Sequence, residues 1–136
     1  MFFKKDKDEN NDLSKVAALL IHAAKIDENF SKNEETIIKQ ALLQIGANDE
    51  NLEKIFLDGK KIEENSNQIL EFTKEVKNMG ENDKIKIVET LWIIIYSNKE
   101  ADIYETSLMR KLGGLLYIDS KLMGDIKEKI KQEIIK

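Results

Sequence analysis

The fold is decided by the run VAALLIHAA, residues 16–24, in which every position except His22 is apolar. A helix that is apolar nearly all round belongs at the centre of a protein, because no face of it suits water. A second run, LWIIIY at residues 91–96, predicts a second central helix. Both runs are far shorter than the roughly 20 apolar residues that a membrane-spanning helix needs. The two runs therefore predict an all-α core.

Seven helices are expected, each marked by apolar residues at steps of three and four. Asn, Asp or Ser before a helix caps its free N–H groups, and Gly after it allows a left-handed turn. Gly46 and Gly80 are expected to end the second and fourth helices, and no stretch alternates as a strand would. The expected caps are Asn11 or Asp12, Ser31, Asn48 or Asp49, Ser66, Asn82, Asp102, and Asp119 or Ser120.

Residues 1–12 are polar and are expected to form a flexible leader, with residues 13–136 as a single domain. Gly59 lies inside the expected third helix. It either costs that helix about 1 kcal/mol relative to Ala or marks a break. The chain is thus expected to be one compact bundle of about seven helices.

The two central helices belong to an internal repeat with a shift of 71 residues. Each unit has an apolar helix, a short acidic loop, a second helix, a cap and a third helix, and the helix after Ser66 joins the units. We expect the small Ala17, Ala23 and Ala24 of the first central helix to leave room for Trp92 and Ile95 of the second. Matched pairs include Lys15 and Lys86, Leu20 and Leu91, Glu34 and Glu105, Lys39 and Arg110, and Ile55 and Ile126.

Composition excludes several classes of site. The chain has no cysteine and one histidine, which excludes disulfides, cysteine-based metal sites and multi-histidine sites. Its net charge is −4 and Arg110 is its one arginine, so we expect no nucleic-acid binding. No apolar segment of a signal peptide follows Met1, which predicts a cytoplasmic protein. Phe2 and Phe3 next to two lysines would give at most peripheral membrane contact.

Two acidic loops hold the candidate metal ligands. They read DENFSKNEE at residues 27–35 and NKEADIYE at residues 98–105. Alternating oxygen-bearing side chains can wrap a hard cation such as Ca²⁺ or Mg²⁺. The first loop is not an EF-hand, because Lys32 and Ile38 stand where that motif needs Gly and Glu. The candidate metal ligands are Asp27, Glu34, Glu100, Asp102 and Glu105.

Helix capping is the alternative explanation for several of these residues. Ser31 and Glu34 fit the capping box, and Asp102 with Glu105 is a close variant. Acidic side chains in a first helical turn are also favoured by the helix dipole. Asp27 and Glu100 precede the caps, so capping explains these two less well.

Three other features have structural explanations. His22 is expected to be a core or boundary residue, and Trp92 a core residue. Gly113 and Gly114 are expected to allow close helix approach or to end the sixth helix. No nucleophile elbow and no phosphate-binding glycine loop is present in the sequence.

The acidic loops carry a family resemblance. A pattern Asp-Gly-Glu-Phe/Leu-Ser/Asp-x-x-Glu that closes each central helix resembles the TerB-like domains of the tellurite-resistance group. The copies here are IDENFSKNE at residues 26–34 and YSNKEADIYE at residues 96–105, and the similarity covers about residues 13–130. The resemblance implies a bacterial seven-helix domain linked to stress resistance, with acidic positions proposed to bind divalent metal. Glu28 and Lys99 replace the glycines of the pattern, while Asn29 and Asn98 replace two of its acids.

These observations favour a non-enzymatic binding module, an adaptor or sensor in a bacterial stress response with a protein partner. A divalent cation could tune it through the acidic loops. The alternative is a small enzyme that uses Asp27, Glu100 or Glu105 as acid–base groups. A deep pocket lined by two carboxylates would favour the enzyme, and a shallow acidic patch beside exposed apolar residues would favour the module.

Overall fold

The computed structural model describes residues 2–25, 32–65, 70–96 and 103–135, and this part of the chain contains seven helices and no strand. The expected all-α bundle of about seven helices is thereby confirmed. The helices are α1 (Phe2–Ala24), α2 (Lys32–Gln44), α3 (Leu52–Glu64), α4 (Leu70–Lys77), α5 (Glu81–Tyr96), α6 (Ile103–Leu115) and α7 (Ser120–Ile135).

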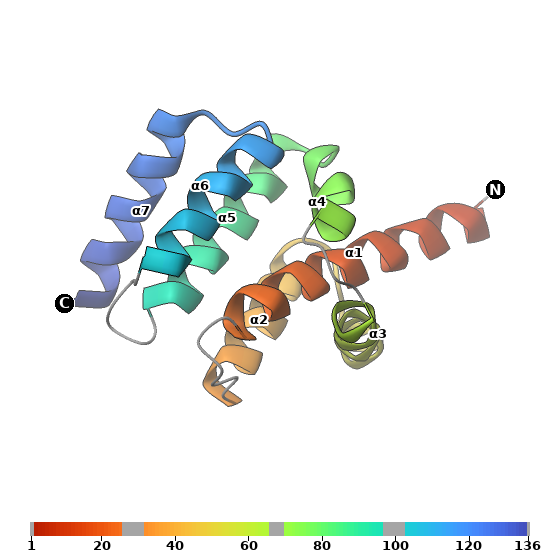
Figure 1. The fold of residues 1–136 in the computed structure, drawn as a ribbon. Coiled ribbons are helices and arrows are strands. Elements are labelled where there is room, and N and C mark those ends of the chain that lie inside the picture. The colour runs from red at the N-terminus through yellow and green to blue at the C-terminus, as the bar shows by residue number, and fades with distance from the viewer. Residues whose placement is uncertain (1, 26–31, 66–69, 97–102, 136) are drawn as a thin grey trace.

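Helix α1 is the centre of the arrangement. It packs against α2, α3, α4 and α5, while α7 lies along the far side of α5 (Figure 1). Its residues 16–21 are fully buried, as are Leu91, Ile94 and Ile95 of α5. Both expected central helices are therefore in the core, because each is apolar on too many faces to lie at the surface.

Helices α1 and α3 cross at very short range. A Cβ atom placed on Gly59 of α3 would lie 2.6 Å from the Cβ of Ala17 and 2.8 Å from the backbone oxygen of Ser14. A side chain at Gly59 would therefore collide with the backbone of α1. Helix α3 continues through Gly59, so of the two alternatives that the sequence left open, the break is excluded. The small Ala17 of α1 lies directly against Gly59. Trp92, which we expected to lie near the alanines of α1, lines a space with residues of α6 and α7.

Some helix ends follow the predicted signals, whereas Asn82, the predicted cap of α5, lies inside that helix because it begins at Glu81. Gly46 has φ of 135° after α2, and the N–H of Ala47 donates back to the Leu42 carbonyl at 2.9 Å, which is a glycine C-cap. The Asn48 side-chain oxygen accepts from the N–H groups of Glu50 and Asn51, both at 3.0 Å. Asn48 therefore caps the turn before α3, whereas the residue at the N-cap of α3 itself is Asn51, which makes no side-chain cap bond.

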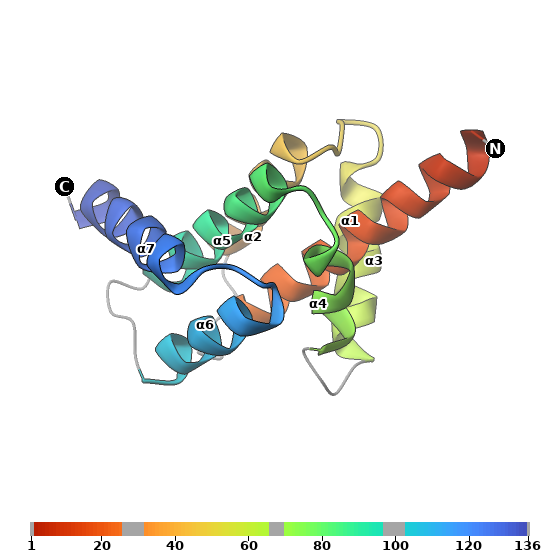
Figure 2. The ribbon, with the colours of Figure 1, turned by 90° about the horizontal axis from the view of Figure 1, so that it is seen from above.

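Helix α1 begins at Phe2, about ten residues before its predicted start. No proline or glycine interrupts residues 2–12, so the helix continues toward the N-terminus where the sequence offers a cap at Asn11 or Asp12. Its first turns project beyond the other helices (Figures 1 and 2). The flexibility expected of this segment stays a prediction.

The carboxylate of Glu63, which is largely buried, joins the end of α3 to the end of α1 by ion pairs. Glu63 has a side chain that is 10% exposed, and Lys25 Nζ donates to its Oε1 at 2.6 Å. His22 Nδ1 lies 3.2 Å from its Oε2, so the expected boundary role of this histidine is confirmed. Burial raises the pKa of the Glu63 carboxyl, but the bonds from Lys25 and His22 outweigh burial and leave that pKa below its ordinary value of 4.5.

Because α1 and α3 cross so closely, adding one methyl group at Gly59 should change the free energy of unfolding strongly. Gly59→Ala should lower the free energy of unfolding by about 1–3 kcal/mol, because the new Cβ forces α1 and α3 apart. The matched control is Gly124→Ala on α7, where a Cβ meets nothing within 4 Å. This control should gain up to about 1 kcal/mol from helix propensity. Urea unfolding of the three proteins measures both effects, and equal stability of Gly59→Ala and wild type would contradict the crossing.

The Glu63 cluster predicts a pH-dependent contribution to stability. Because folding lowers the pKa of Glu63, its charge stabilises the fold above pH 4.5 and loses this effect as pH falls through the lower folded pKa. Glu63→Gln should therefore cost about 1–3 kcal/mol near pH 7 and much less near pH 3. Unfolding at both pH values, with the exposed Glu64→Gln as control, checks this. A cost that is the same at both pH values would contradict it.

Candidate functional site

Most of the predicted metal ligands lie outside the described part of the chain. This holds for Asp27, Glu100 and Asp102, and for the side chain of Glu105 in the first turn of α6. Glu34 is described, in the first turn of α2, with 1% of its surface exposed. No group of three His, Asp or Glu side chains that could hold a metal occurs among the described residues. The predicted metal site therefore stays a prediction.

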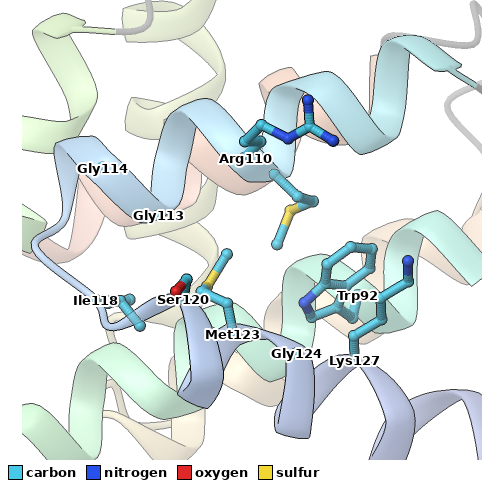
Figure 3. Close-up of a pocket in the computed structure, with 10 residues that line it drawn as sticks. Trp92, Arg110, Gly113, Gly114, Ile118, Ser120, Met123, Gly124 and Lys127 are labelled. Atoms are coloured by element: carbon cyan, nitrogen blue, oxygen red, sulfur yellow. The ribbon is translucent and has the colours of Figure 1, made fainter.

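The described residues contain a ligand-sized pocket that the loops did not predict. It has a volume of about 370 Å³ and lies between α6 and α7, with α5 beneath it (Figure 3). Figure 2 shows α6 and α7 diverging from the segment that joins them. The lining residues are Trp92 of α5, Met109, Arg110, Gly113 and Gly114 of α6, Ile118 of the connection, and Ser120, Met123, Gly124 and Lys127 of α7.

The internal repeat explains why the pocket is open. Helices α2 and α6 run from residues 32–44 and 103–115, which is the same shift of 71 residues that relates the sequences. In the first unit α2 packs against α3 and the space is filled by Leu42 and Phe56, both buried. At the corresponding positions the second unit has Gly113 and Lys127. The second unit therefore has less apolar side-chain volume at these two positions, and Met123 lies 3.4 Å from where a Cβ of Gly113 would be.

Trp92 forms the floor of the pocket and is 3% exposed, which confirms its expected burial. Its ring stacks on Tyr96 with centroids 5.8 Å apart, and Lys127 Nζ lies 5.4 Å from the ring centroid. The indole Nε1 is buried and has no hydrogen-bond partner among the described residues. In Figure 3 this nitrogen is on the ring edge that faces Met123. A buried donor without an acceptor costs about 1–3 kcal/mol, so the floor of the pocket offers a polar contact that the protein itself leaves unused.

Arg110 lies at the rim of the pocket, exposed to solvent. Its counterpart in the first unit is Lys39, which donates to Glu53 Oε2 at 2.9 Å and to Glu35 Oε2 at 3.3 Å. The bond to Glu53, more than any other effect, raises the pKa of Lys39. Residues 106 and 124, which correspond to those two glutamates, are Thr and Gly. The cation is thus retained in the second unit while both of its carboxylate partners are replaced.

The sequence contained the signals for this pocket, but separately. Trp92 was expected in the core, Gly113 and Gly114 were expected to allow close approach, and Arg110 stood out as the single arginine. Gly113 does approach a neighbour, because a Cβ there would lie 3.4 Å from Met123, whereas Gly114 faces open space. The repeat also shows Gly113 and Lys127 at the positions of Leu42 and Phe56, but it does not show which helices meet there.

No described helix is both long and apolar enough to cross a membrane. The sequence model of the family described as tellurite resistance protein TerB matches residues 13–128. Neither the curated proteins nor the solved structures contain a match to this chain.

Thermal melts separate helix capping from metal binding in the acidic loops. Ser31→Ala and Asp102→Ala should each cost about 0.5–2 kcal/mol with chelator and with millimolar cation, because a cap acts without metal. If Asp27 and Glu100 are ligands, Asp27→Asn and Glu100→Gln should lower the melting temperature only with cation present.

For the wild type we expect a small cation-induced shift of the melting temperature or none, since Asn29, Asn98 and Lys99 leave the loops short of negative charge. An unchanged melting temperature with calcium, magnesium and manganese would exclude a metal site. A stabilisation of about 2.7 kcal/mol, the value for a cation at a hundredfold excess over its Kd, would contradict our expectation.

Proposed function

Because this chain belongs to the TerB family of tellurite resistance proteins, we propose that it is a non-enzymatic binding module in a tellurite-related stress response. In this role it acts as a sensor or adaptor that recognises a ligand in the pocket between α6 and α7. The TerB family is not generally known for enzymes, which agrees with the proposal.

The observation that supports a binding role is the chemistry of the pocket. Its lining is mainly apolar, with two cationic side chains at the rim and one indole N–H at the floor. Small-molecule binding sites have this composition, in which a few polar groups orient a ligand that apolar walls hold. The alternative enzyme would use carboxylates as acid–base groups, and the lining of this pocket contains none.

The pocket differs from both patterns that the sequence suggested as tests. It is not lined by two carboxylates, as the acid–base enzyme would require, and it is apolar and basic instead of acidic. We therefore place recognition in this pocket and assign the acidic loops a secondary role, where a divalent cation could tune the module. The proposal places the protein in the bacterial cytoplasm with a protein partner that responds to the occupied state.

Growth on tellurite tests the proposal. Deleting the gene in its native host should lower the tellurite concentration that stops growth, and wild-type protein should restore it. Gly124→Leu should not restore growth, because its side chain enters the pocket while a Cβ at this position meets no other atom within 4 Å. Lys111→Gln, which changes an exposed residue next to Arg110, is the control that should restore growth.

Equal amounts of folded protein in each strain, checked by immunoblot and by melting of the purified variants, are required for this comparison. Full restoration of growth by Gly124→Leu would contradict a role for the pocket. Unchanged tolerance in the deletion strain would contradict the tellurite-related role.

A further inference from the structure

We propose that the pocket between α6 and α7 binds a small amphiphilic carboxylate, an organic acid with a carboxylate head and an apolar body like that of a medium-chain fatty acid. This inference rests on the proposed binding function and names the class of its ligand. It depends on three features of the second unit: a cation that forms no ion pair with the described residues, a buried donor without a partner among them, and an apolar space of suitable size.

The first unit shows what the cation at this position contacts. Lys39 binds the carboxylate of Glu53 at 2.9 Å, beside the ring of Phe56, whose centroid lies 4.9 Å from its Nζ. In the second unit Arg110 takes the place of Lys39 and Gly124 takes the place of Glu53. No carboxylate of the described residues forms an ion pair with Arg110. A ligand carboxylate beside Gly124 would restore the ion pair that the first unit makes within its own chain.

Arginine suits this role better than the lysine of the first unit. Its planar guanidinium binds both oxygens of a carboxylate at once, whereas an ammonium acts as a point charge. Lys127 adds a second positive charge on the opposite wall, held over the face of Trp92. The two cations at the rim therefore favour an anion at the pocket mouth, although the whole chain carries a net charge of −4.

The floor of the pocket supplies a second polar contact. Buried donors in folded proteins almost always have an acceptor, so the indole N–H of Trp92 is an exception that calls for one. The nitrogen is on the ring edge turned toward Met123 in Figure 3, and a methionine side chain moves easily because it is unbranched. A ligand oxygen that displaces the Met123 thioether would accept this hydrogen bond.

The remaining walls suit an apolar body. Met109, Met123 and Ile118 line the pocket, and Gly114 and Gly124 leave open space where other residues would project a side chain. The volume of about 370 Å³ is at the lower end of the range of about 300–1,000 Å³ for small-molecule sites. A helix of a partner protein would need a longer groove, which is why we assign the pocket to a small molecule.

Trp92 is the only tryptophan of the chain, so its fluorescence reports directly on the pocket. Decanoate titrated into the full-length protein, below its micelle concentration, should change the emission of Trp92 in a saturable way. Decanol has the same chain without the charge and should bind at least about tenfold more weakly, because it lacks the ion pair with Arg110.

Two pairs of variants test the assignment of the residues. Arg110→Gln should weaken decanoate binding about tenfold or more, while Lys111→Gln, which removes the same charge one residue away, should leave it unchanged. Gly124→Glu supplies the first unit's carboxylate to Arg110 and should abolish decanoate binding. Gly124→Gln, which has the same size without the charge, should weaken it less.

Selective, saturable binding of decanoate that Arg110→Gln loses and Lys111→Gln keeps would support the proposal. Equal affinity for decanoate and decanol, or for wild type and Arg110→Gln, would overturn it. A response to an acidic amphipathic peptide without any response to decanoate would also overturn it and assign the pocket to a protein partner. If decanoate fails while Gly124→Leu still abolishes growth on tellurite, the ligand class is wrong and the proposed function stands.

Discussion

The close crossing of α1 and α3 at Gly59 sets the positions of the helices around it. A Cβ at this residue would lie 2.8 Å from the backbone of α1, so the distance between the two helices requires a glycine there. Helix α1 in turn contacts α2, α4 and α5, and its run of small and branched apolar residues is fully buried between them. The ion pair of Glu63 with Lys25 then fixes the same two helices at the end of α3. One position without a side chain thus allows α3 to lie directly against the backbone of α1.

The two units of the repeat have related helices but different side chains between the second and third helix of each unit. The first unit fills the space beside its second helix with Leu42 and Phe56 and neutralises Lys39 with two glutamates. The second unit has Gly113 and Lys127 in place of those apolar side chains, and Arg110 has no such partners. Among the described residues, the first unit thus has two buried apolar side chains at positions where the second unit has a glycine and a half-buried lysine. Functional sites commonly lower the stability of a protein, which agrees with an unfilled space between α6 and α7.

Much of the fold could be predicted from the sequence, because helix periodicity and capping depend on residues close together in the chain. Gly46 and the central run at residues 16–24 acted as expected. The start of α1 was misplaced because a good cap at Asn11 or Asp12 does not prevent a helix from continuing past it. The role of Gly59 could not be predicted, since spacing alone does not say which helix a glycine faces. The pocket was missed because it depends on Trp92, Arg110 and Gly124, which are distant in sequence and meet only in the folded chain.

The second unit has Gly113 and Lys127 where the first has Leu42 and Phe56, and we propose that the unfilled space beside Trp92 is a binding pocket. The most direct test is the stability of Lys127→Phe, which places the first unit's Phe56 side chain over Trp92 without touching α1 or α3. If the pocket is an unfilled part of the core, urea unfolding should show this variant to be about 0.5–2 kcal/mol more stable than wild type. A loss of stability would show that the space does not accept the first unit's side chain and would contradict the account.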